Sequence, residues 1–82
     1  MDKFMLNMYN YLNGYMERNH SNISKLDRED IAQVAAQGGY DEYSENCNEV
    51  KALAVAVDIC EKLVSDISEV SDKNMSVFVR FL

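Results

Sequence analysis

The chain contains no proline and only three glycines, so it lacks the residues that most often interrupt a helix or form a turn. A sheet of many short strands needs such residues at each turn, and this sequence does not supply them. Hydrophobic residues make up 48% of the chain, which is enough to build a core and too many for a disordered tail. A length of 82 residues corresponds to a single domain. We therefore predict one all-α domain over residues 1–82, with a small core.

The spacing of polar and apolar residues predicts the first two helices. In residues 2–18, polar side chains recur every three or four positions, and apolar side chains occupy the opposite side. A second helix is expected over residues 27–37, with Asp27 as its N-cap. It would end before Gly38 and Gly39, because glycine favours the left-handed backbone that closes a helix.

Two more helices complete the predicted bundle. Asn46 is expected to act as an N-cap, and apolar residues at spacings of three and four continue the third helix over residues 47–70. Residues 74–82 fit both a short helix and a strand. We choose the helix, because a lone strand would leave its backbone hydrogen-bonding groups unpaired. The expected fold is a bundle of three main helices, with the short C-terminal helix packed on the first.

Acidic residues outnumber basic ones and are concentrated in the middle of the chain. The formal net charge is −6, from 8 basic and 14 acidic residues. Residues 41–72 carry 2 basic and 9 acidic groups, whereas residues 73–82 carry 2 basic groups and no acidic group. Because phosphate binding requires clustered Lys and Arg, this balance argues against direct binding of nucleic acid and of anionic membranes. The negative charge favours solubility or attraction of a basic partner.

The sequence offers no recognisable catalytic or metal-binding arrangement. The only histidine, His20, falls in a predicted polar loop, and we interpret it as solvent-exposed. The spacing of Cys47 and Cys60 fits neither a CxxC pair nor a zinc site. No apolar leader precedes them, so we expect two reduced thiols in a cytoplasmic protein without a membrane span. We expect no enzymatic activity, no cofactor and no metal.

An acidic segment that also carries tyrosines is the strongest candidate for a binding surface. It covers the approach to the third helix and part of that helix, and tyrosine is common at interface hot spots. The alternative interpretation is an ordinary solvated helix face, because Lys51 and Lys62 interrupt the acidic row. The predicted partner-binding residues are Tyr40, Asp41, Glu42, Tyr43, Glu45, Glu49, Asp58 and Glu61.

These features predict a non-enzymatic protein-binding module that covers a basic site on a protein partner. In size and charge the chain is similar to small inhibitors that phages and mobile elements direct against host defence, some of them by mimicking nucleic acid. This similarity is an analogy by size and charge, and no motif supports it. The expected partner is a protein with a basic surface.

The sequence leaves two other functions open. A structural or regulatory subunit would complete a larger helical assembly through the apolar segment 52–57. A small-ligand binder would use a tyrosine-lined pocket at a subunit interface. The apolar residues exceed what a three-helix monomer can cover, so we expect a homodimer. The expected self-association residues are Tyr9, Tyr11, Met16, Ala54 and Val55.

Overall fold

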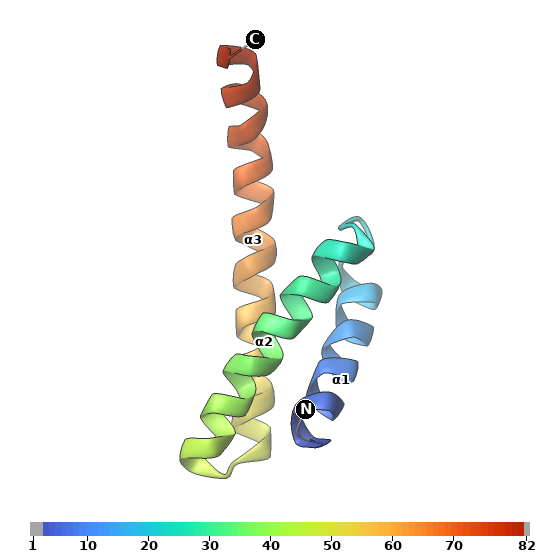
Figure 1. Cartoon of the computed structure of the whole chain (residues 1–82), viewed down its shortest axis with the longest axis vertical. Helices are drawn as coiled ribbons and strands as arrows, with labels where there is room; N and C mark the ends of the chain where they lie inside the picture. Colours follow the sequence, from blue (N-terminus) through green and yellow to red (C-terminus); the bar gives the residue numbers. More distant parts are fainter. Residues whose placement is uncertain (1–2, 82) are drawn as a thin grey trace.

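The computed structural model describes the backbone of residues 3–81 and the side chains of residues 3–67. It contains three helices, α1 (Lys3–Asn19), α2 (Lys25–Asn46) and α3 (Glu49–Phe81) (Figure 1). No strand occurs in the described backbone. The predicted all-α fold is confirmed.

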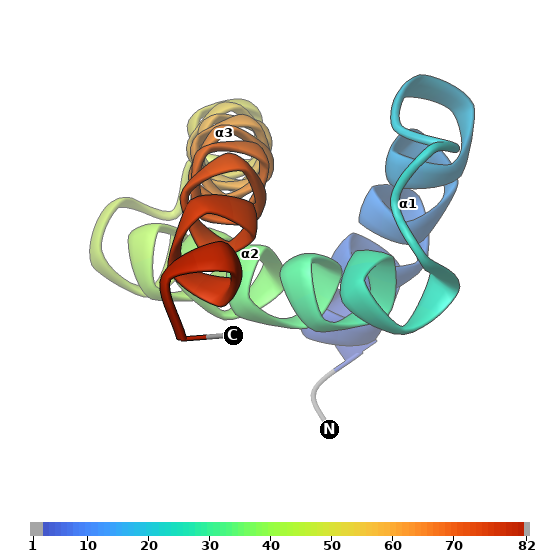
Figure 2. The ribbon, with the colours of Figure 1, turned by 90° about the horizontal axis from the view of Figure 1, so that it is seen from above.

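The second helix holds the other two together. Both α1 and α3 pack against α2, and their contact with each other is much smaller. Seen from above, α1 and α3 lie on the same side of α2 and stand apart from each other (Figure 2). The molecule is elongated, with extents of 50 × 22 × 21 Å, because α3 continues beyond the other two helices (Figure 1). The result is an open three-helix bundle in which α1 and α3 pack on the same side of α2 and leave a space between them.

Small residues and methionines form most of the core. Five of the ten buried apolar residues are alanines, so α2 and α3 can approach each other closely. The largest side chains without any exposed surface are Leu12, Met16 and Cys60. The whole core consists of Met8, Leu12, Met16, Ile31, Ala32, Ala35, Ala36, Ala52, Ala56 and Cys60.

Helix α2 continues through Gly38 and Gly39, so the prediction that it ends at residue 37 is wrong. Neither glycine has a positive φ, and therefore neither adopts the left-handed cap conformation. Both lie where α2 crosses α3. A β-carbon at Gly39 would lie 3.0 Å from the carbonyl oxygen of Ala52, and one at Gly38 would overlap the Cδ1 of Ile59. The glycines thus permit close packing, which offsets their helix propensity penalty of about 1 kcal/mol each relative to alanine.

The start of α2 is set by a serine. The Ser24 hydroxyl accepts a hydrogen bond from the backbone N–H of Asp27 at 3.2 Å, so Ser24 is the N-cap and Asp27 lies in the first turn. The prediction of Asp27 as N-cap is therefore wrong by three residues. Arg28 fixes the preceding loop, because its Nη1 donates to the carbonyl oxygens of Ser21 and Ile23 at 3.3 and 2.9 Å. This loop carries His20.

The turn between α2 and α3 needs no glycine. Cys47 adopts the left-handed conformation (φ 53°, ψ 30°), and its N–H donates to the carbonyl oxygen of Tyr43 at 2.7 Å. Asn48 then caps α3 by accepting a hydrogen bond from the N–H of Lys51 at 3.0 Å. Asn46, the predicted N-cap of this helix, is instead the last residue of α2. The extra length of α2 shifts the whole turn toward the C-terminus.

The C-terminal segment belongs to α3. The helix is continuous from Glu49 to Phe81, so residues 74–81 extend it and do not form a separate helix. No glycine or proline lies beyond residue 70 to force a break. The predicted packing of residues 74–82 on the first helix concerns side chains outside the described residues. Among the described helices, none has both the length and the apolar character needed to cross a bilayer.

Candidate functional site

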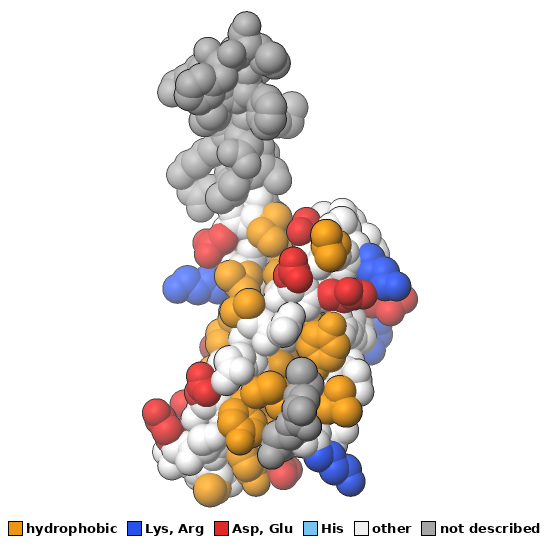
Figure 3. Space-filling model, viewed as in Figure 1, with side chains coloured by type: hydrophobic (Ala, Val, Ile, Leu, Met, Phe, Trp, Pro, Cys, Tyr) orange, Lys and Arg blue, Asp and Glu red, His pale blue; other side chains and the backbone are white. Residues whose placement is uncertain are grey.

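Three acidic residues lie near the C-terminal end of α2, and we term Asp41, Glu42 and Glu45 the acidic turn. Asp41 and Glu45 are exposed, whereas the Glu42 side chain is only 19% exposed. The Glu42 carboxylate accepts a hydrogen bond from Nδ2 of Asn46 at 2.7 Å and lies 3.2 Å from Nζ of Lys51. Figure 3 shows red side chains gathered at the lower left, over this end of α2.

The backbone adds to the negative potential of the acidic turn. A helix C-terminus carries about half a negative charge, from carbonyl groups without intrahelical partners. All side chains of α2 are described, and its last turn contains no basic residue that would balance this charge. Acidic groups near a helix C-terminus disfavour the helix by about 0.3–1 kcal/mol each. The chain thus holds negative charge at a position where helix stability disfavours it.

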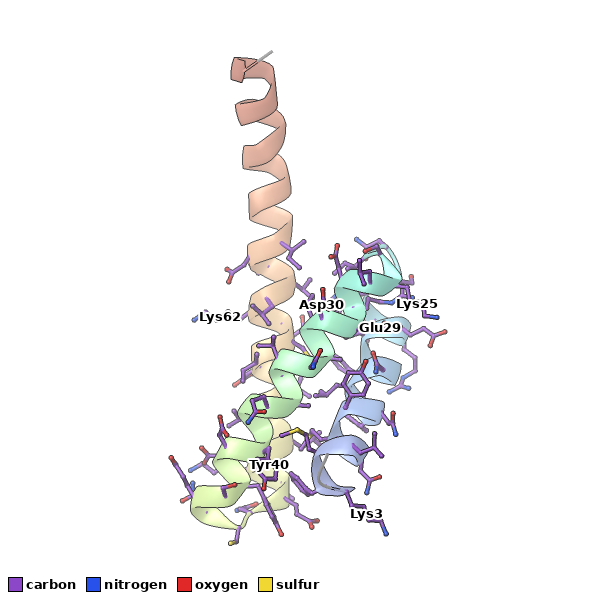
Figure 4. The ribbon with its side chains drawn as sticks, in the orientation of Figure 1. Lys3, Lys25, Glu29, Asp30, Tyr40 and Lys62 are labelled. Carbon is purple, nitrogen blue, oxygen red and sulfur yellow. The ribbon has the colours of Figure 1, made fainter. Side chains whose placement is uncertain are left out.

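Tyr40 and Tyr43 pack between helices and lie on α2, not in a connecting loop. Both are half-buried. Tyr43 stacks on Phe4 of α1 with ring centroids 4.2 Å apart, and Tyr40 lies at a tilt to the same ring, 6.3 Å away. Figure 4 shows Tyr40 at the end of α2 that lies near the start of α1, where Lys3 is labelled. Both rings therefore pack within the chain, and their contact with a partner stays a prediction.

The acidic row predicted along α3 is interrupted at Glu61. Asp58 is exposed, as expected for a partner-binding residue. Oε1 of Glu61, however, accepts hydrogen bonds from the Tyr15 hydroxyl and from Nε2 of His20, the latter at 2.8 Å. One carboxylate oxygen thus joins the end of α1, the α1–α2 loop and α3. Because one of its carboxylate oxygens already accepts two hydrogen bonds within the chain, Glu61 is a weaker candidate for partner contact than Asp58.

His20 is a structural residue, so its interpretation as a solvent-exposed loop residue is wrong. Its side chain is 18% exposed, and its ring meets that of Tyr15 at an edge with centroids 6.2 Å apart. The hydrogen-bond partner Glu61 is 41 residues away in the sequence. No local spacing around His20 could have revealed this contact, because it exists only once α3 has packed beside the α1–α2 loop.

The hydrogen bonds in this cluster change the acidity of two side chains. Hydrogen bonds from His20 and then from Tyr15 lower the pKa of Glu61. The bond to the Glu61 carboxylate, together with burial, raises the pKa of Tyr15 from 10.0 to about 12. Near neutral pH the cluster therefore holds an ionised carboxylate and a protonated phenol. It offers neither a phenolate nucleophile nor a protonated carboxylic acid for general acid catalysis.

The Glu61 interaction should stabilise the fold near neutral pH and be lost in acid. Because folding lowers the pKa of Glu61, its contribution is present above the ordinary glutamate pKa and disappears as pH falls through the folded-state pKa. The side chain is 45% exposed, so we expect at most about 1 kcal/mol. Urea denaturation of Glu61→Gln should therefore show a smaller loss of stability on acidification than the wild type. The exposed Glu17→Gln provides the control, and an equal effect of both variants would contradict the assignment.

The predicted self-association residues do not form one surface. Met16 is fully buried within the monomer, so its assignment to a dimer surface is wrong. Tyr9 and Tyr11 line different grooves, one between α1 and α2 and the other between α1 and α3. On α3, Ala54 is exposed and Val55 is half-buried. The open bundle divides the apolar residues of α1 between a groove shared with α2 and a groove shared with α3.

Two open apolar grooves flank α1. The groove between α1 and α2 has a volume of about 440 Å³ and is lined by Met5, Tyr9, Gln33, Val34, Ala36 and Gln37. The second groove lies between α1 and α3, and we term it the α1–α3 valley. It has a volume of about 280 Å³ and is lined by Phe4, Asn7, Met8, Tyr11, Glu49 and Leu53. Glu49, predicted to bind a partner together with the acidic turn, thus lies in the valley.

The cysteines are free thiols in different environments. Cys47 is exposed in the α2–α3 turn, and Cys60 is buried in the core. Burial raises the pKa of Cys60 to about 11, so this thiol stays protonated at neutral pH. Within the part of the chain whose side chains are described, no three His, Cys, Asp or Glu residues converge as a metal site requires.

Comparisons of the chain with models of protein families, with curated proteins and with solved structures found no match. The function therefore has to be argued from geometry and charge. The acidic turn and the α1–α3 valley are the two surface features that such an argument can use.

Proposed function

We propose that the protein is a non-enzymatic binding module whose acidic turn contacts a basic surface on a protein partner. The observation that carries the proposal is the placement of the exposed Asp41 and Glu45 at the C-terminal end of α2. The helix dipole has the same sign at Glu45, which lies in the last turn, so this charge disfavours the helix, whereas Asp41 lies one turn earlier. Binding explains such a placement better than folding does.

The local contacts support a surface that is already organised before a partner arrives. Nε2 of Gln37 donates to Oδ1 of Asp41 at 3.0 Å and so holds this carboxylate near the helix surface. Lys51 is paired with Glu42, which leaves Asp41 and Glu45 without compensation from that lysine. Exposed carboxylates beside a helix C-terminus would attract a basic surface over a distance and raise the association rate. A partner whose basic site is covered in this way would be inhibited.

Charge reversal at the acidic turn tests this proposal. In Asp41→Lys/Glu45→Lys, both changes are at exposed positions, so the fold should be retained while partner binding weakens. The matched control is Glu17→Lys/Asp30→Lys, which makes the same change of charge at exposed positions on α1 and on the first half of α2, away from the acidic turn. The partner would be captured from the source cells with the wild type, identified by mass spectrometry, purified, and titrated with each variant.

The acidic-turn variant should bind at least about tenfold more weakly, and the wild-type association rate should fall steeply with added salt. The control should bind like the wild type. Equal affinity of the wild type and the acidic-turn variant would refute the proposal. A loss confined to the control would also refute it, because the contact would then lie near Glu17 and Asp30.

A structural or regulatory subunit is the second candidate, and the α1–α3 valley favours it. Tyr11 of the valley is 46% exposed and Val50, next to Glu49, is 80% exposed. The apolar segment 52–57 is not available as a whole, because Ala52 and Ala56 are fully buried within the monomer. A helix added to this protein would therefore contact the valley.

A further inference from the structure

The α1–α3 valley is an apolar groove that no part of the described chain fills. Phe4, Met8 and Tyr11 line it from α1, and Leu53 lines it from α3. Figure 2 shows α1 and α3 standing apart on the same side of α2, and both contact α2 more than they contact each other. A groove between two helices, with apolar walls and a polar edge, accepts the apolar face of a third amphipathic helix.

We propose that the α1–α3 valley binds the C-terminal segment, residues 73–82, of a second copy of this chain. The resulting homodimer is independent of the acidic turn and goes beyond the proposed function. It commits the valley to one occupant, and the reasons lie in charge, in sequence pattern and in the length of α3.

Charge distinguishes this segment from the rest of the chain. It carries Lys73 and Arg80 and no acidic residue, for a charge of +2, whereas the remainder carries −6 − 2 = −8. The one charged residue that lines the valley is Glu49, which is exposed. A basic segment and an acidic groove edge attract each other, although the two copies as a whole repel.

The sequence of the segment has the spacing of an amphipathic helix. Met75, Phe78, Val79 and Leu82 recur at intervals of three, one and three, as residues on one helix face do. The backbone is helical to Phe81. The sequence of the segment therefore offers apolar residues at helical spacing together with two basic residues, which matches the apolar lining and the acidic edge of the valley.

The segment of the same copy cannot reach the valley. Because α3 is a single helix, Leu53 and Phe81 are about 42 Å apart at 1.5 Å per residue. Figure 1 shows the end of α3 and the start of α1 at opposite ends of the molecule. A second copy related by a twofold axis, with its α3 antiparallel to the first, brings each segment to the valley of the other copy. The dimer then contains two identical contacts, each between the segment of one copy and the valley of the other, and we term these contacts the joints.

A charge-swap experiment on the full chain tests the joints directly. The valley variant, Asn7→Lys/Glu49→Lys, makes the groove edge basic at two exposed positions. The segment variant, Lys73→Glu/Arg80→Glu, makes the segment acidic. Each variant alone places like charges at both joints, so its dimer dissociation constant should rise about tenfold or more. Sedimentation equilibrium at micromolar concentrations measures this, and circular dichroism verifies that each variant keeps its helices.

Mixing the two variants in equal amounts gives the decisive result. In a mixed dimer the basic valley faces an acidic segment, and the second joint is the wild-type one, so association should return to nearly wild-type affinity. The Glu17→Lys/Asp30→Lys control, at exposed positions that do not line the valley, should dimerise like the wild type. A wild type that stays monomeric, a dimer that neither variant weakens, or a mixture that stays dissociated would each overturn the proposal. None of these outcomes bears on Asp41 and Glu45, which are unchanged throughout.

Discussion

Replacement of Leu12 with alanine should lower the free energy of unfolding by about 2–5 kcal/mol. Leu12 has no exposed surface and is one of the three largest fully buried side chains, so its truncation removes apolar burial and leaves a cavity. Native domains are stable by only about 5–15 kcal/mol, and an 82-residue domain belongs at the lower end. Urea denaturation followed by circular dichroism should therefore show a large shift of the midpoint or complete loss of the folded baseline.

The matched control is Leu26→Ala, because Leu26 is 69% exposed on α2 and loses little burial when truncated. Its effect should stay within about 0.5 kcal/mol. Similar midpoints for the two variants would mean that Leu12 is not buried in the core. Leu63 and Ile67 of α3 are only partly buried, so truncation there should have a smaller effect than truncation of Leu12.

The second large effect is expected at the helix crossing, where Gly39→Ala should destabilise the protein by about 1–3 kcal/mol. The added β-carbon would lie 3.0 Å from the Ala52 carbonyl oxygen and 3.1 Å from the Ala56 β-carbon. Neither neighbour can rotate away, since one is backbone and the other is attached directly to it. The steric cost should therefore exceed the gain of about 1 kcal/mol in helix propensity.

The neighbouring glycine supplies the control for this prediction. At Gly38 the added β-carbon would meet the end of the Ile59 side chain, which is flexible and partly exposed. A rotamer change can relieve that contact, and the helix propensity gain then brings Gly38→Ala close to wild-type stability. Thermal denaturation of both variants compares their stabilities directly. If Gly39→Ala were as stable as Gly38→Ala, α2 and α3 would not cross at Gly39.

The same two glycines explain why the second helix was predicted too short. A glycine pair after an amphipathic stretch is a common helix end, and the sequence around residue 38 contains no sign against that interpretation. Its actual role depends on Ala52 and Ala56, which become neighbours of Gly39 only after α3 folds back on α2. The first helix was predicted more accurately, because its apolar residues repeat at regular spacing along its whole length. The third was predicted to start close to Glu49, but it continues to Phe81 and does not end at residue 70.

The candidate site, like the fold, could be predicted only in part from the sequence. Charge counting located the acidic segment, since a surplus of carboxylates is visible without a structure. It could not separate Asp41 and Glu45, which are exposed, from Glu61, which accepts hydrogen bonds from the distant Tyr15 and His20. Nor could it place the acidic turn on a helix C-terminus, because that position follows from the continuation of α2 past the glycines.

Helix α2 runs unbroken through the glycine pair to Asn46. Both the acidic turn at the end of α2 and the crossing that opens the α1–α3 valley depend on it. Backbone NMR chemical shifts of residues 38–47 test this claim most directly. We expect helical shifts through Asn46, followed by a left-handed Cys47. Random-coil shifts from Gly38 onward would contradict the account, because Asp41 and Glu45 would then lie in a loop without a helix terminus beside them.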